Sequence, residues 1–168
     1  MSVAIFLPSL AGGGAERIAL FVTERLRAAG IDARLVVARA TGALIDAPVY
    51  RTHGVDLRAP NELLSLPALS RYLDRERPEL LFAFVHSAKI IAGIAKQRRP
   101  WLRLAISVHN ALDVPRRARF WPRALFGYAP ERWLYRDVVA AHAVSHDLAA
   151  QVIRRFALPP QHVHTIYN

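Results

Sequence analysis

Short apolar runs alternate along the chain with segments whose apolar residues recur every three or four positions. Glycine, proline or polar residues bound the runs, which have the length of buried strands. The run at 80–85 is almost wholly apolar, as expected of a strand inside a parallel sheet. We predict strands at 3–7, 33–38, 49–52, 80–85, 102–108, 138–144 and 163–166, of which 49–52 is the weakest.

The segments between these runs predict amphipathic helices. The first follows a glycine-rich loop, places Ile18, Val22 and Leu26 on one face, and ends near Gly30. Further helix starts are predicted at the N-cap residues Ser65, Ser87 and Ser145, and at 130–131. Strands that alternate with helices predict a doubly wound, Rossmann-like α/β domain with a parallel sheet, spanning residues 1–168.

The glycine loop lies between the first strand and the first helix, where Gly12, Gly13 and Gly14 are consecutive. Glycines allow a ligand to approach the backbone, and the free N–H groups at a helix start attract anions. A dinucleotide fingerprint would need a third glycine at Arg17, and a P-loop needs a Gly-Lys-Ser/Thr ending that is missing here. We therefore expect phosphate or sugar contact without a standard NAD or ATP site; a plain turn is the alternative.

Ligands of doubly wound sheets bind at the carboxyl ends of the strands. Besides the glycine loop, three pairs of polar residues follow predicted strands, and we expect them on the same edge of the sheet. The pairs are His86 with Ser87, His109 with Asn110, and Ser145 with His146.

The formal charge of +10 comes almost entirely from arginine and suggests an anionic partner, unless a further part of a larger protein balances it. No nucleic-acid-binding motif is present, so we do not expect nucleic acid. There is no cysteine, the histidines are scattered without metal-ligand spacing, and no apolar run reaches the roughly 18–20 residues that span a bilayer. We expect no metal, no signal peptide and a cytoplasmic location.

Segment 113–136 interleaves basic and aromatic side chains, a composition that suits an anionic membrane surface. A folded loop with its aromatics packed inward and its arginines in water is the alternative. The candidate membrane-surface residues are Arg116, Arg117, Arg119, Phe120, Trp121 and Arg123.

Four elements together resemble the N-terminal half of a family 4 glycosyltransferase, which has the two-domain GT-B architecture. They are the Pro-Ser-Leu-x-Gly-Gly-Gly-Ala-Glu-Arg stretch at 8–17, Ser-Val-His-Asn at 107–110, Ala-Val-Ser at 143–145 and Thr-Ile-Tyr-Asn at 165–168. The resemblance covers the whole chain. It implies transfer of a sugar from a nucleotide-sugar to an acceptor glycan or glycolipid, with retention at the anomeric carbon and no cofactor or essential metal. It also implies that this domain holds the acceptor and that a C-terminal domain beyond Asn168 binds the donor.

The same resemblance assigns roles to residues. Gly13 and Gly14 match the glycine pair whose backbone approaches the donor diphosphate and the acceptor. His109 matches a strand-end histidine that touches the transferred sugar, and its ring would donate to a sugar hydroxyl or orient the reacting groups. The remaining substrate-binding candidates are Gly12, Glu16, Arg17, His86, Asn110 and Ser145, with a structural ion pair as the alternative role of Arg17 and an N-cap as that of Ser145.

Two alternatives remain open: a nucleotide- or polyanion-binding module without chemistry, and a sugar-nucleotide epimerase of the same fold. A second Rossmann unit with a paired-glutamate motif downstream would favour the transferase.

Overall fold

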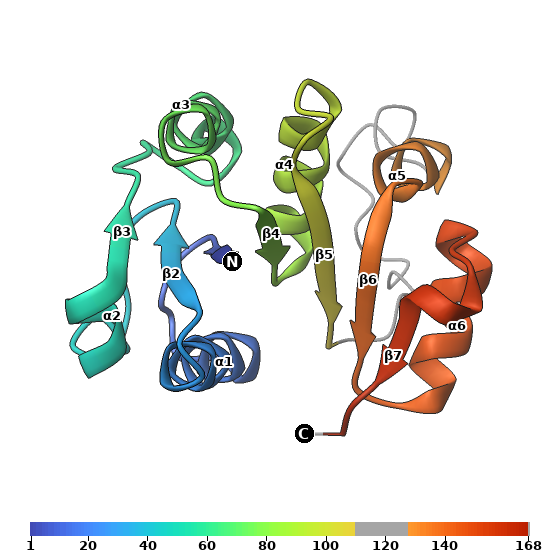
Figure 1. Cartoon of the computed structure of the whole chain (residues 1–168), viewed down its shortest axis with the longest axis horizontal. Coiled ribbons are helices and arrows are strands. Elements are labelled where there is room, and N and C mark those ends of the chain that lie inside the picture. The colour runs from blue at the N-terminus through green and yellow to red at the C-terminus, as the bar shows by residue number, and fades with distance from the viewer. Residues whose placement is uncertain (110–127, 168) are drawn as a thin grey trace.

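A computed structural model describes residues 1–109 and 128–167. Seven parallel strands form one sheet in the order β3-β2-β1-β4-β5-β6-β7 (Figure 1). The strands are β1 (Ser2–Leu7), β2 (Asp32–Val37), β3 (Gly54–Asp56), β4 (Leu80–Ala83), β5 (Arg103–Val108), β6 (Val138–Ala143) and β7 (Val163–Thr165). The helices are α1 (Gly14–Ala28), α2 (Pro48–His53), α3 (Leu66–Glu76), α4 (His86–Gln97), α5 (Tyr128–Tyr135) and α6 (His146–Phe156), with 3₁₀ turns at Leu63–Ser65 and Pro160–His162. The predicted doubly wound Rossmann-like fold is confirmed.

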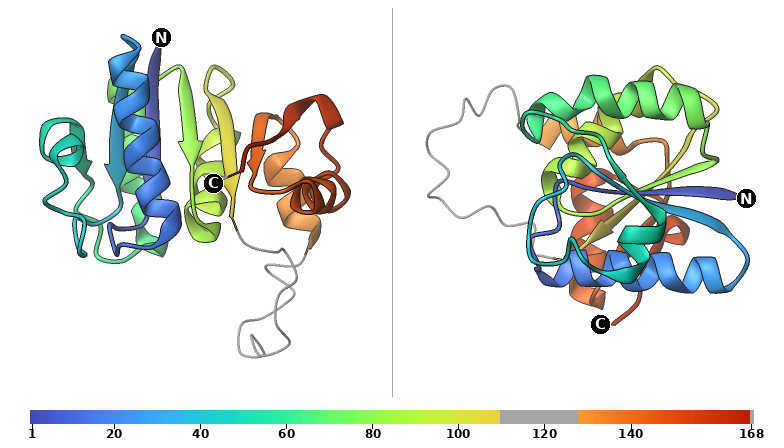
Figure 2. Two further views of the ribbon diagram at one scale, coloured as in Figure 1. Left: turned by 90° about the horizontal axis from the view of Figure 1, so that it is seen from below. Right: turned by 90° about the vertical axis from the view of Figure 1, so that its left-hand side faces the viewer.

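Helices cover both faces of the sheet, so the domain has three layers (Figure 2). Two cores separate these layers: one contains residues of α3, α4, α5 and α6, and the other residues of α1 and α2. Strand β1 contributes to both, because successive side chains of a strand point to opposite faces. Ala4 and Phe6 lie in the first core, whereas Val3, Ile5 and Leu7 lie in the second.

Helix α1 ends as its sequence predicts. Gly30 has a φ of 76°, its N–H donates to the carbonyl of Arg27, and the N–H of Ile31 donates to the carbonyl of Leu26. This is the pattern of a glycine-terminated helix, and it turns the chain directly into β2.

The predicted strand at 49–52 is wrong, because these residues belong to helix α2. Pro48 occupies the first turn of that helix, where its fixed φ favours helix and its missing N–H is not needed. The edge strand β3 follows at once and pairs with Leu35–Val37 of β2. The edge strand therefore exists, but it begins five residues later than predicted.

Two predicted serine caps do not form, although Ser65 does occupy the predicted N-cap position of α3. Helix α3 follows the 3₁₀ turn, and the Ser65 hydroxyl donates to the carbonyl of Glu62 instead of capping. Helix α4 begins at His86, so Ser87 lies inside its first turn. At α6 the prediction is confirmed, because the Ser145 Oγ accepts a hydrogen bond from the N–H of Leu148.

Candidate functional site

The sheet order reverses between β1 and β4, which is where ligands bind in doubly wound folds. The glycine loop follows β1 and His86 follows β4, so they flank this switch point. His109 follows β5, and Ser145 follows β6 on the same edge. Asn110 and the six candidate membrane-surface residues at 116–123 lie outside the described residues.

The glycine loop has a conformation that depends on its glycines. Gly12 has a φ of 103°, in a region that side chains rarely adopt. Gly13 precedes the first residue of α1, and a Cβ there would lie 2.6 Å from a carboxylate oxygen of Glu16. Gly14 faces open space, with no atom within 4 Å of a Cβ built on it. The loop therefore presents an open backbone surface at Gly14, next to the start of α1.

Glu16 and Arg17 both interact with this loop. The Glu16 carboxylate lies against Gly13 in the first turn of α1, where the helix dipole stabilises a negative charge. The Arg17 Nε donates to the Gly12 carbonyl at 3.3 Å. Among the described residues Arg17 forms no ion pair, so the predicted structural ion pair is replaced by a contact that braces the loop.

His109 lies half-buried at the end of β5, where three side chains fix its ring. The ring stacks on Phe84 with centroids 5.7 Å apart, and the edge of His142 contacts it at the same centroid distance. The Ser107 hydroxyl lies 2.8 Å from the His109 Nε2. Burial lowers the pKa of His109 to about 4, and the nearby His142 and Lys89 act in the same direction. The ring is therefore neutral at neutral pH.

A second group of ionisable side chains lies between α4, α5 and α6. Glu131 is buried, and one of its oxygens accepts hydrogen bonds from Nε and Nη2 of Arg155 at 3.0 and 2.9 Å. His86 approaches the other oxygen at 3.8 Å. Desolvation lowers the pKa of His86, although 61% of its side chain is exposed; Glu131 opposes this shift.

Lys89 is the least expected member of this group. It is only 4% exposed, and burial lowers its pKa to about 8, with Glu131 opposing and Arg155 adding to the decrease. Together Lys89 and Arg155 place two cationic side chains around one carboxylate. Of these two cations, Lys89 lies close enough to His109 to help lower its pKa.

Val85 connects β4 to α4 and adopts a φ of 64° with a ψ of 149°. A β-branched residue at positive φ is strained by about 1–3 kcal/mol. The strain lies directly before His86, next to the switch point.

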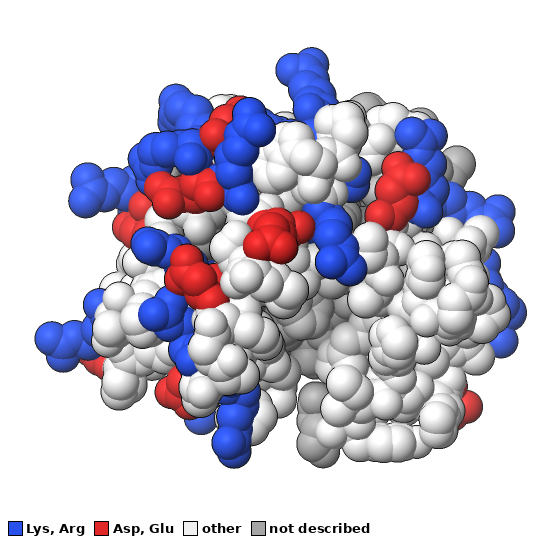
Figure 3. All heavy atoms as spheres, viewed as in Figure 1, with Lys and Arg blue, Asp and Glu red and all other residues white. Residues whose placement is uncertain are grey.

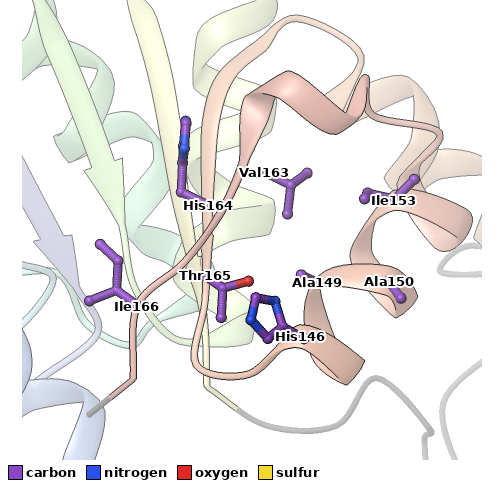
Figure 4. A pocket seen from close by; sticks show the side chains of 8 residues that line it. All are labelled: His146, Ala149, Ala150, Ile153, Val163, His164, Thr165 and Ile166. Atoms are coloured by element: carbon purple, nitrogen blue, oxygen red, sulfur yellow. The ribbon is translucent and has the colours of Figure 1, made fainter.

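A separate hollow of about 710 Å³ lies between α6 and β7, the strand at one edge of the sheet (Figure 4). In Figure 4, His146 and Thr165 point toward one another across it. Figure 3 shows that this lower right part of the surface is largely uncharged, whereas Lys, Arg, Asp and Glu gather over the other parts of that face. Of the polar residues that we predicted at the strand ends, His146 lines the hollow, whereas the glycine loop, His86, His109 and Ser145 do not.

Sequence reasoning missed Ser107, His142, Lys89 and Glu131. A lysine within the otherwise apolar stretch 88–95 was a usable indication, because such a helix buries most of its surface. Among the described residues there is no group of three or more His, Asp or Glu arranged to hold a metal ion, and no helix long and apolar enough to cross a membrane.

The parallel sheet and the helices on both of its faces define a Rossmann-like α/β domain, and solved GT-B structures have the same fold. The crystal structure of Anabaena Alr3699/HepE in complex with UDP-glucose superimposes with a TM-score of 0.73 at 14% identity. The match covers 100% of this chain and 44% of that one. The lipopolysaccharide outer core galactosyltransferase WaaB gives a TM-score of 0.70 at 15% identity, over 100% of this chain and 46% of that one. The UDP-GlcNAc 2-epimerase from Neisseria meningitidis gives a TM-score of 0.69 at 14% identity, over 98% of this chain and 46% of that one.

These likenesses establish the fold, and the chain spans less than half the length of each of these structures, matching their N-terminal half. The family model for glycosyltransferase family 4 matches residues 12–168, so the chain belongs to that family. No curated protein matches the chain.

Proposed function

We propose that this chain is the acceptor-side domain of a retaining glycosyltransferase, which moves a sugar from a nucleotide-sugar to a cell-surface glycolipid or polysaccharide precursor. Family membership supports sugar transfer in general. The observation that carries the proposal is the position of the open glycine loop and His109 on one edge of the sheet, on either side of the β4 strand end. A second Rossmann-like domain, C-terminal to this one, would bind the donor nucleotide.

The loop supplies a polar surface for the reacting groups. The N–H groups of Gly14, Ala15 and Glu16 precede the first intrahelical bond, which runs from the Arg17 N–H to the Gly13 carbonyl. Such N–H groups stabilise negative charge that develops on a leaving phosphate. Because the Glu16 carboxylate already lies against Gly13, the open side at Gly14 is where a phosphate or sugar would approach.

Charge favours a phosphorylated partner at this edge. Lys89 is a buried cation near the Glu131 carboxylate, which also binds Arg155. A buried cation with an altered pKa is also typical of functional sites. A lipid-linked or otherwise phosphorylated acceptor would match this charge, and segment 113–136 would bring the domain to the bilayer that holds such an acceptor.

The test is a donor screen on the full-length protein, with lipid-linked and soluble acceptors offered in parallel. Transfer that retains the anomeric configuration supports the proposal. Release of an epimerised nucleotide-sugar would favour the epimerase, and nucleotide binding without turnover would favour a binding module. His109→Ala serves as the matched variant of low activity.

A further inference from the structure

Ser107 connects two histidines of neighbouring strands. Its Oγ lies 2.8 Å from Nε2 of His109 and 2.7 Å from Nδ1 of His142. The other nitrogen of His142, Nε2, lies 3.0 Å from the carbonyl oxygen of Ile166. Because Ser107 pairs with His142 across the β5–β6 ladder, the sheet itself holds the hydroxyl and the ring together.

The carbonyl at the end of this chain sets the direction of every bond in it. A carbonyl oxygen only accepts, so Nε2 of His142 must carry a proton. In a neutral ring Nδ1 then accepts, so the Ser107 hydroxyl donates to His142. The Ser107 oxygen is left to accept from Nε2–H of His109.

We propose that Ser107 and His142 are positioning residues that hold His109 in the tautomer with its proton on Nε2, which leaves Nδ1 as a hydrogen-bond acceptor. His109 is half-buried at the strand end, so its ring remains open to a partner. The low pKa of His109 is consistent with this, since the ring stays neutral.

This tautomer selects the chemistry of that partner. An acceptor nitrogen accepts a hydrogen bond from a hydroxyl. It repels a phosphate oxygen, because neither the nitrogen nor the phosphate oxygen brings a proton. We therefore assign the His109 contact to a sugar hydroxyl that donates to Nδ1, and not to the diphosphate. The consequence for substrates rests on the proposed function, whereas the tautomer is a property of the free protein.

The tautomer is measured by long-range ¹H–¹⁵N correlation spectra of the ¹⁵N-histidine-labelled protein at neutral pH. We expect a single tautomer for His109, with the proton on Nε2, and the same tautomer for His142. In Ser107→Ala, His109 should become a mixture of the two neutral tautomers, with the proton on Nε2 or on Nδ1. His164→Gln, which changes the next histidine across the β6–β7 pair, is the matched control and should leave His109 unchanged.

Two results would overturn the inference. One is a His109 proton on Nδ1 in the native protein, which a charged His142 would impose by reversing both serine bonds. The other is an unchanged single tautomer in Ser107→Ala. If that variant does not fold, His142→Phe removes the same connection from the other strand and must give the mixture instead.

Kinetics separate this inference from the proposed function. Ser107→Ala should lower kcat about tenfold, the scale of one hydrogen bond, with KM little changed. Native protein that shows the Nε2–H tautomer but transfers no sugar would refute the proposed function alone. Sugar transfer by a protein whose His109 carries its proton on Nδ1 would refute this inference alone.

Discussion

Lys89→Met should stabilise the protein at neutral pH. Lys89 is 4% exposed, and its pKa of about 8 replaces an ordinary value of 10.5. This difference corresponds to roughly 3 kcal/mol by which folding disfavours the charged ammonium. Methionine has a similar length and no charge, and Glu131 keeps both hydrogen bonds from Arg155. We expect a gain of up to about 3 kcal/mol, because the lowered pKa already includes the attraction between Lys89 and Glu131.

The pH dependence of this gain follows from linkage. Below pH 8 the lysine is protonated in both the folded and unfolded states, so the native protein bears the whole penalty. Between pH 8 and 10.5 the unfolded state binds more protons, and the stability of the native protein therefore rises. The advantage of Lys89→Met should thus be largest below pH 8 and fade toward pH 10.5.

Denaturant unfolding of the native protein and of Lys89→Met at pH 7 and pH 10 measures both the gain in stability and its dependence on pH. Lys96→Met is the control on the same helix, since the Lys96 ammonium donates to the carbonyls of Arg99 and Pro100 and its loss should not stabilise. The reasoning is refuted if Lys89→Met is less stable at pH 7, because attraction to Glu131 would then exceed the desolvation penalty. An equal gain at both pH values would show that apolar packing, and not charge, is responsible.

Four further outcomes are expected. Gly14→Val should lower transfer by the full-length enzyme sharply and leave its melting temperature nearly unchanged, because the side chain enters open space; native kinetics would show that the loop is only a turn. His109→Ala should reduce turnover by roughly 10²-fold. In the native enzyme, protonation of His109 should reduce the rate only as the pH falls toward about 4. If His109→Ala lowers thermal stability but not the rate, His109 is structural. Val85→Gly should raise the free energy of unfolding by about 1 kcal/mol by relieving the positive φ, and a decrease would show that the valine side chain contributes more than the strain removes. Liposome sedimentation should show salt-sensitive binding to anionic vesicles. This dependence on anionic lipid should disappear when glutamine replaces Arg116, Arg117, Arg119 and Arg123. Negligible binding to all vesicles would contradict membrane attachment.

The fold could be predicted because the apolar runs are long enough to distinguish strand from helix. The run at 49–52 was too short for this, and its β-branched residues favoured strand, whereas Pro48 and the backbone bonds to Ala47 decide for helix. Caps were predicted less well, because a serine before an apolar segment does not fix the start of the helix. At Ser87 the N-cap position lies two residues earlier, at Val85.

The strand-end positions of the candidate site could be predicted, but its contacts could not. The Ser107–His142 contact depends on the register of β5 and β6, which shifts between Leu104 and Ala105. Counting from the predicted strand starts, 102 and 138, would place Ser107 opposite Ala143 instead of His142. The burial of Lys89 likewise depends on how α5 packs against α4 and how α6 packs against α5, which no local pattern contains.

The central position of β1 has a consequence for synthesis on the ribosome. Its two neighbours are Asp32–Val37 and Leu80–Ala83, and the second of these emerges more than seventy residues after β1 itself. Until then β1 has an unpaired edge and side chains that end up completely buried. Because contacts between distant residues form slowly and exposed strand edges promote aggregation, the nascent chain is most vulnerable between these two events. We expect chaperones to act on this protein before residue 83 has left the exit tunnel.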